Sequence, residues 1–147
     1  MGVQRSILRI LTAVLLVGGC GGGSHDSHGG STDPTRTVDV AMRDIAYDPA
    51  TLSVKAGETV KFVFRNEGAI RHDAFLGDEA AQAAHEKEMR EKGSGEKDGH
   101  HGEDAITVDP GETGSLTHTF KAGDMLVIGC HEVGHYAAGM KITVTVT

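Results

Sequence analysis

Hydrophobic and polar residues alternate along most of the chain after residue 36. This alternation, with a period of two, covers residues 38–42, 52–54, 60–64, 116–120 and 140–146. It places successive side chains on opposite faces of a β-strand. The apolar segments 105–108 and 125–130 fit further strands, the second of them buried. About seven short strands separated by Gly- and Pro-containing turns predict a β-sandwich or a β-barrel.

Two segments of similar sequence each predict a pair of strands joined by a tight turn. VKAGETVKFVF spans residues 54–64, and VDPGETGSLTHTF spans residues 108–120. Both place Gly-Glu-Thr between a short strand and a longer alternating one. We expect each segment to form a β-hairpin, because Gly readily adopts the conformations that reverse a chain.

Residues 78–104 do not follow the strand pattern, since they are rich first in Ala, Glu and Lys and then in Gly. Asp78 can cap a helix that runs from Glu79 to about Lys92. The Gly-rich remainder is expected to be flexible. We therefore expect this segment to be a helical and flexible insertion between strands rather than an element of the core.

The beginning of the chain predicts an export signal over residues 1–19. Arg5 and Arg9 precede the apolar stretch 10–17, which is too short to span a bilayer. The sequence LVGGC at residues 16–20 resembles a bacterial lipoprotein signal, in which cleavage leaves Cys20 at the new N-terminus for lipid attachment. The alternative is an ordinary secretory signal with an incidental cysteine. We favour the lipoprotein interpretation, in which the protein is exported and a lipid anchors it to the periplasmic side of the cell membrane.

Residues 20–35 are rich in Gly and Ser and predict a flexible tether. His25 and His28 in this tether either bind a metal ion weakly or are incidental. The domain proper is expected to span residues 36–147. The chain carries a net charge of −7, which argues against a nucleic-acid partner.

The chain has two cysteines, and only Cys130 lies within the predicted domain. If Cys20 carries lipid, Cys130 is a free thiol in an oxidising compartment. Such a thiol is vulnerable to oxidation unless a metal ion occupies it.

Soft metal donors gather near the C-terminus. Cys130, His135 and Met140 are spaced C-x4-H-x4-M, and His72 lies upstream. One thiolate, two imidazoles and a weak thioether are the donor set of copper sites that transfer electrons. Zinc also binds the first three donors, but a thioether is not among its usual ligands.

At these residues the chain resembles the cupredoxins, the family of type 1 (blue) copper proteins that includes plastocyanin, azurin and rusticyanin. YDPATLSVKAGETVKFVFRNEGAIRHDAF, residues 47–75, resembles the first half of such a domain, and the spacing of the C-terminal loop is rusticyanin-like. The resemblance implies a Greek-key β-sandwich over roughly residues 37–147, apart from the insertion. It implies one type 1 copper with four ligands: His72, Cys130, His135 and, as the axial ligand, Met140.

The resemblance also indicates two residues that support the ligands without binding the metal. Asn66 ends the strand that precedes His72, and Asp73 stands where cupredoxins often have Asn. We expect Asp73 to accept a hydrogen bond from a backbone N–H of the 130–132 segment. Its negative charge would favour Cu(II).

The remaining histidines divide into three groups. His131 is expected to point away from copper, since neighbours on an extended chain face opposite ways. His118 fits a partly exposed residue of a sheet. In the insertion, His85, Met89, His100 and His101 either form a loose second copper site or belong to a solvated, charged flap.

The expected activity is one-electron transport without catalysis. A two-copper centre needs a second loop cysteine, and multicopper enzymes need further histidine pairs. The protein would pass electrons, as a monomer, between redox partners such as cytochromes, which would dock on an apolar rim formed by Val133, Tyr136, Ala137 and Ala138. The alternative is a copper-binding protein for copper tolerance, storage or delivery, with a copper-handling protein as partner.

Overall fold

The computed structural model describes residues 34–92 and 103–147. The predicted lipid site Cys20, the tether with His25 and His28, and His100 and His101 lie outside these residues. The described elements are β1 (Arg36–Arg43), β2 (Ala46–Asp48), β3 (Thr51–Val54), β4 (Thr59–Asn66), β5 (His72–Gly77), α1 (Glu79–Lys92), β6 (Ala105–Val108), β7 (Thr113–Thr119), β8 (Val127–Gly129) and β9 (Lys141–Val146).

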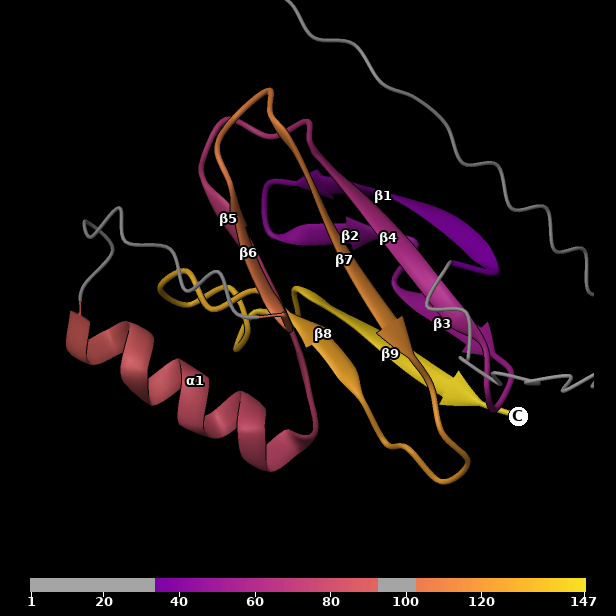
Figure 1. Ribbon diagram of the computed structural model, residues 1–147. Coiled ribbons are helices and arrows are strands. Elements are labelled where there is room, and N and C mark those ends of the chain that lie inside the picture. The colour runs from indigo at the N-terminus through magenta and orange to yellow at the C-terminus, as the bar shows by residue number, and fades with distance from the viewer. Residues whose placement is uncertain (1–33, 93–102) are drawn as a thin grey trace, which may run out of the picture. The chain divides into compact units, whose positions relative to one another are not determined.

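The strands form two sheets, which confirms the predicted all-β sandwich. One sheet has the order β2-β1-β4-β7 and the other the order β3-β9-β8-β5-β6 (Figure 1). β1 runs parallel to β4, and β3 runs parallel to β9. The other pairs are antiparallel. Because β5 and β8 are neighbours in the second sheet, the residues at their ends come close together although they are far apart in sequence.

The two segments of similar sequence do not form hairpins, so that prediction is wrong. In the first segment, β3 pairs with β9, whereas β4 pairs with β1 and β7. In the second segment, β6 pairs with β5, whereas β7 pairs with β4. Each segment therefore carries the chain from one sheet to the other. Their shared sequence forms the same turn twice: Glu58 N donates to Lys55 O and Glu112 N donates to Asp109 O, each at 3.0 Å. Alternation shows which face of a strand is buried, but it does not identify the neighbouring strand.

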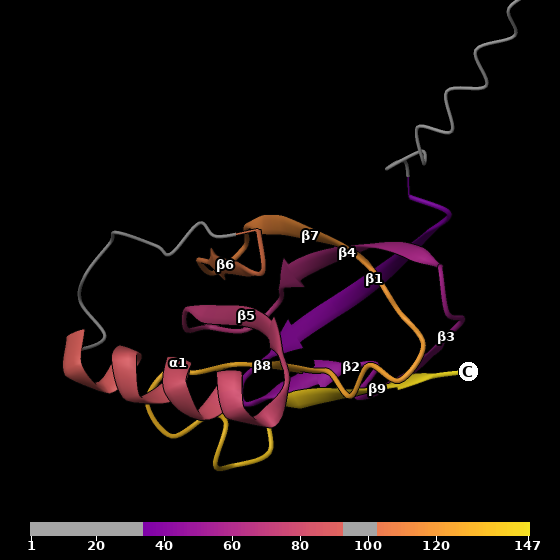
Figure 2. The same ribbon diagram turned by 60° about the horizontal axis from the view of Figure 1, so that its bottom comes forward.

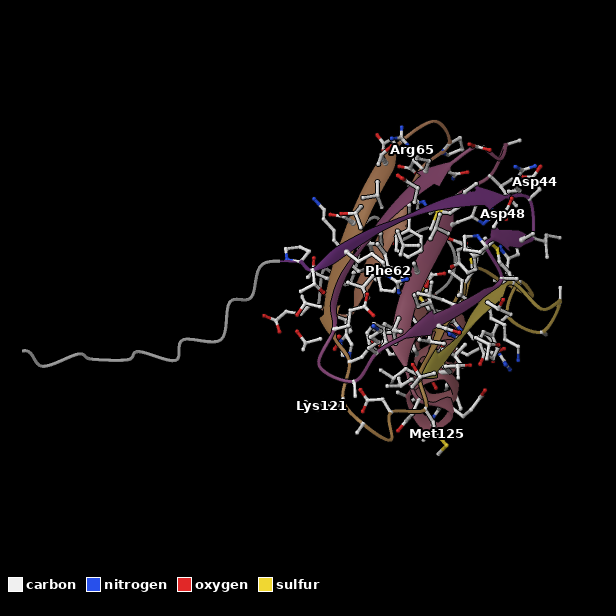
Figure 3. The ribbon with its side chains drawn as sticks, turned by 90° about the vertical axis from the view of Figure 1, so that its right-hand side faces the viewer. Asp44, Asp48, Phe62, Arg65, Lys121 and Met125 are labelled. Carbon is white, nitrogen blue, oxygen red and sulfur yellow. The ribbon has the colours of Figure 1, made fainter. Side chains whose placement is uncertain are left out.

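The core fills the space between the sheets with apolar side chains from both. Phe62 contacts Phe64 and Phe120, with ring centroids 6.1 and 6.3 Å apart. Phe62 lies in the middle of the sandwich, whereas Arg65 and Lys121 lie at its periphery (Figure 3). The predicted buried strand at 125–130 is shorter than expected, because Met125 precedes β8 and is 83% exposed.

Helix α1 begins and ends where the sequence predicts. Asp78 caps it, since its Oδ1 accepts a hydrogen bond from Ala81 N at 2.8 Å. The predicted helical insertion outside the core is confirmed, because no described residue of α1 belongs to the apolar core cluster. The helix nevertheless packs against β5 and β8 (Figure 2), and its Gln82 is completely buried. Within residues 34–92 and 103–147, no helix is long and apolar enough to cross a bilayer.

Candidate metal centre

Three strands of the second sheet position the predicted copper ligands. His72 is the first residue of β5. Cys130 directly follows β8, and Met140 directly precedes β9. Cys130 N donates to Met140 O at 3.1 Å, so the β8–β9 pair fixes both ends of the segment 130–140, here called the ligand loop. A rigid sheet thus positions residues that lie in a loop.

Three of the four predicted ligands converge on one point. The donor atoms of His72, Cys130 and His135 all lie within 4.8 Å of one another. Cys130 Sγ is 3.3 Å from Nδ1 of His135 and 3.8 Å from Nδ1 of His72. His72, Cys130 and Met140 are completely buried, and His135 is 8% exposed. A soft thiolate beside two imidazoles fits copper, and the enclosure keeps water from the donors.

Burial also sets the charge of the donors. It raises the pKa of the Cys130 thiol well above its ordinary value, and the Asp73 carboxylate adds to this effect. Burial likewise lowers the pKa of His72, and His135 adds to that shift. The thiol therefore keeps its proton and the imidazole stays neutral until a cation compensates the thiolate charge.

Asp73 and Asn66 support the two segments that carry the donors. Asp73 Oδ1 accepts a hydrogen bond from the backbone N–H of His131, the contact that the sequence predicts. Asn66 Nδ2 donates to the carbonyls of Ile70 and Val108 at 2.8 and 2.9 Å. Asn66 thereby shapes the turn that leads to β5.

Gly68 lies in that turn and approaches the site closely. A Cβ at this position would be 2.5 Å from Asp44 Oδ1 and 3.2 Å from His72 Nε2. Asp44 Oδ1 also accepts a hydrogen bond from Ala69 N at 2.9 Å. Sequence reasoning missed Asp44, because it belongs to the distant β1–β2 turn.

His131 and His118 behave as structural residues. His131 is 3% exposed and its Nε2 lies 2.6 Å from Gln82 Oε1, so it contacts α1 rather than joining the donor cluster. Its burial identifies His131 as a structural residue. The half-buried His118 packs edge-on against Phe120, with ring centroids 4.9 Å apart.

The predicted second copper site is not assembled within the described residues. His85 is 7% exposed, its Nε2 is 3.3 Å from Asp73 Oδ2, and its ring stacks on Phe75 at 4.2 Å. Met89 is half-buried. In the part of the chain that the structure describes, no second group of three His, Cys, Asp or Glu donors converges. His85 is engaged inside the protein, and a second site stays a prediction.

Sequence reasoning missed Gln82, the polar residue that joins α1 to the ligand loop. The signal was present in the helix itself. Gln82 lies three residues before His85, so both fall on one helical face, and that face turns inward.

Comparison with known proteins identifies the family. The sequence model of the copper-binding proteins of the plastocyanin/azurin family matches residues 34–147. The chain belongs to this family. The cofactor of this cupredoxin is copper, in agreement with its cluster of two histidines and one cysteine.

Relatives and solved structures of this cupredoxin agree with that assignment. A copper-resistant cuproprotein CopI of Pseudomonas aeruginosa is 33% identical over 138 residues, covering 76% of each chain. A protein of the same name from Rubrivivax gelatinosus is 37% identical over 113 residues, covering 76% of this chain and 67% of the relative. The reduced auracyanin of Roseiflexus castenholzii superposes with a TM-score of 0.64 at 27% identity, covering 78% of this chain and 99% of auracyanin.

Proposed function

We propose that this protein binds one copper ion through His72, Cys130, His135 and Met140 outside the cytoplasm and so protects the cell against copper. The observation that carries the proposal is the match to two relatives named copper-resistant cuproproteins, over three quarters of this chain. The electron-carrier interpretation, which the sequence favoured, becomes the second candidate. No catalytic reaction is part of the proposal.

The burial of the donors supports a protein that retains copper. His135 is the most exposed of the four proposed ligands, at 8%. Copper leaves such a site only if the ligand loop opens, so release is slow. Bound copper supplies a one-electron couple, and the thiolate together with Met140 favours Cu(I). The protein contributes enclosure and donors already gathered, which reduces the entropy lost on binding.

Growth of a copper-sensitive bacterial strain tests this proposal. Wild-type protein should restore growth at elevated copper, and Cys130→Ser should fail at equal protein level. His118→Ala is the matched control, because it removes an imidazole away from the site, and it should protect like the wild type. Equal protection by Cys130→Ser would refute copper binding at this site as the basis of tolerance.

The second candidate is favoured by one feature, the exposed apolar residues of the ligand loop. Val133 is 68% exposed close to the nearly buried His135, a suitable surface for transient docking of a redox partner. Val133→Glu separates the two candidates, since it changes the docking surface but no proposed ligand. Unchanged protection in this variant supports copper holding. Loss of protection with copper still bound supports electron transfer to a partner such as a cytochrome.

A further inference from the structure

Helix α1 contacts the ligand loop next to the cysteine. Gln82 Oε1 lies 2.6 Å from Nε2 of His131, the residue after Cys130. One turn earlier along the helix, Glu79 Oε2 accepts a hydrogen bond from the Tyr136 hydroxyl at 3.1 Å. The helix therefore touches the loop at two positions.

Gln82 is anchored on its other side by the sheet. Its side-chain amide nitrogen lies 2.7 Å from Val127 O, 3.1 Å from Phe75 O and 3.3 Å from Gly77 O. These carbonyls belong to β8 and β5, the two strands that carry Cys130 and His72. Since Gln82 is completely buried, its amide joins helix, sheet and loop away from competing water.

The contact determines which nitrogen of His131 carries a proton. An amide oxygen is an acceptor, so His131 Nε2 must donate to Gln82. His131 Nδ1 is then the unprotonated nitrogen, in agreement with its lack of a hydrogen-bond partner among the described residues. The ring also stacks on Tyr136, with centroids 4.6 Å apart and planes inclined by 19°.

The residue before Cys130 takes part in the same packing. A Cβ on Gly129 would lie 2.6 Å from Gln82 Oε1 and 2.6 Å from the Tyr136 ring. Helix and loop can approach this closely because residue 129 has no side chain. Both chain neighbours of Cys130 are thus held by the packing of α1 against the loop.

We propose that Gln82 and His131 are positioning residues, through which α1 holds Cys130 in the geometry that retains copper. This inference rests on the proposed copper site and assigns α1 a role in it. Without the contact, the ligand loop gains conformations in which Sγ leaves the two imidazoles. Binding must then order the loop, and copper dissociates faster. Losing such a supporting contact should speed copper loss by about tenfold.

The experiment uses full-length, copper-loaded protein and a matched pair of variants at His131. His131→Leu removes the donor to Gln82, whereas His131→Gln places an amide nitrogen near the position of Nε2 and keeps it. Gln82→Leu breaks the contact from the helix side. Three quantities are measured: the visible thiolate-to-copper absorption, the rate of copper loss to an excess of chelator, and the unfolding temperature.

We expect His131→Leu and Gln82→Leu to shift or weaken the absorption and to lose copper about tenfold faster, and His131→Gln to remain near wild type. A wild-type absorption and rate in His131→Leu, even with a lower unfolding temperature, would reduce Gln82 and His131 to a structural role and overturn the inference. If Gln82→Leu does not fold, the His131 pair decides alone. Absence of the absorption in wild-type protein would instead refute the copper site itself.

Discussion

Cys130 shows how the surroundings of one side chain decide its chemistry. The thiol is completely buried, and burial raises its pKa, so its proton leaves only when a cation takes its place. The two imidazoles beside it belong to the same cluster, so the fold itself brings the donors together. At the residue scale, the site is arranged for a soft cation.

Met140→Leu should leave copper bound, because the axial thioether is the weakest of the four proposed donors. Leu has a similar volume, so the completely buried position should tolerate it. The reduction potential should rise, since an electron donor to the metal is lost. A redox titration monitored by visible absorption measures the shift. Complete loss of copper would show that Met140 is a primary ligand.

The copper-free protein should lose stability as the pH falls below about 6.5, the usual pKa of His. Burial is the main cause that lowers the pKa of both His72 and His131 in the folded state. The unfolded state therefore binds more protons in this range, so the free energy of unfolding rises with pH through it and falls on acidification. Glu132, whose pKa burial raises, acts in the opposite direction, but it is one group against two imidazoles.

Urea unfolding of copper-free protein at about pH 7 and about pH 5 checks this expectation. The midpoint should move to lower urea at the lower pH. An unchanged midpoint would show that these two imidazoles are as easily protonated in the folded state as in the unfolded state.

At the scale of elements, alternation predicted the strands with one buried face and an apolar run predicted the fully buried β8, whereas β5 was missed. β1, β4, β7 and β9 alternate and were predicted. β5 has only one residue that is not buried, because α1 covers its outer face, and so it shows no alternation. The short β2 also escaped prediction. The three ligands of the loop were predictable because their spacing is local, whereas His72 depended on the family resemblance. Gln82 was missed, because its spacing from His85 shows a shared helical face but not that this face contacts the ligand loop.

Asp78→Ala should lower the free energy of unfolding by about 1 kcal/mol, because the N-terminus of α1 loses the side chain that accepts from Ala81 N. The Gln82–His131 contact should survive, so the visible absorption of copper-loaded protein should not change. Glu91→Ala, on an exposed position of the same helix, is the control and should change the free energy by less than about 0.5 kcal/mol. Chemical denaturation compares the three proteins. Equal stabilities would show that the cap contributes nothing.

At the scale of the whole molecule, the sandwich is a scaffold that brings one buried donor cluster together at the ends of two strands. The chain carries a net charge of −7. This charge repels acidic partners and attracts cations and basic proteins. The sequence before the described residues bears on where the molecule resides. We propose that residues 1–19 direct export and that Cys20 carries the lipid that anchors the domain.

Cys20→Ser should move the protein from the membrane fraction to the soluble fraction of a bacterial host. The serine cannot accept the lipid, while the described domain is left intact. Cell fractionation followed by immunodetection measures the distribution, with Cys130→Ser as the control that should stay in the membrane fraction. Wild-type protein found entirely in the soluble fraction, with an N-terminus other than Cys20, would disprove the anchor.

The most direct test of the copper site is the visible absorption of copper-loaded wild-type protein beside Cys130→Ser. The wild type should show an intense thiolate-to-copper band, because Sγ of Cys130 lies with two imidazole nitrogens in one cluster. The variant should lack the band while circular dichroism shows that the sandwich still folds. A band that persists in Cys130→Ser, or a copper-loaded wild type without one, would contradict the assignment of Cys130 as the thiolate ligand.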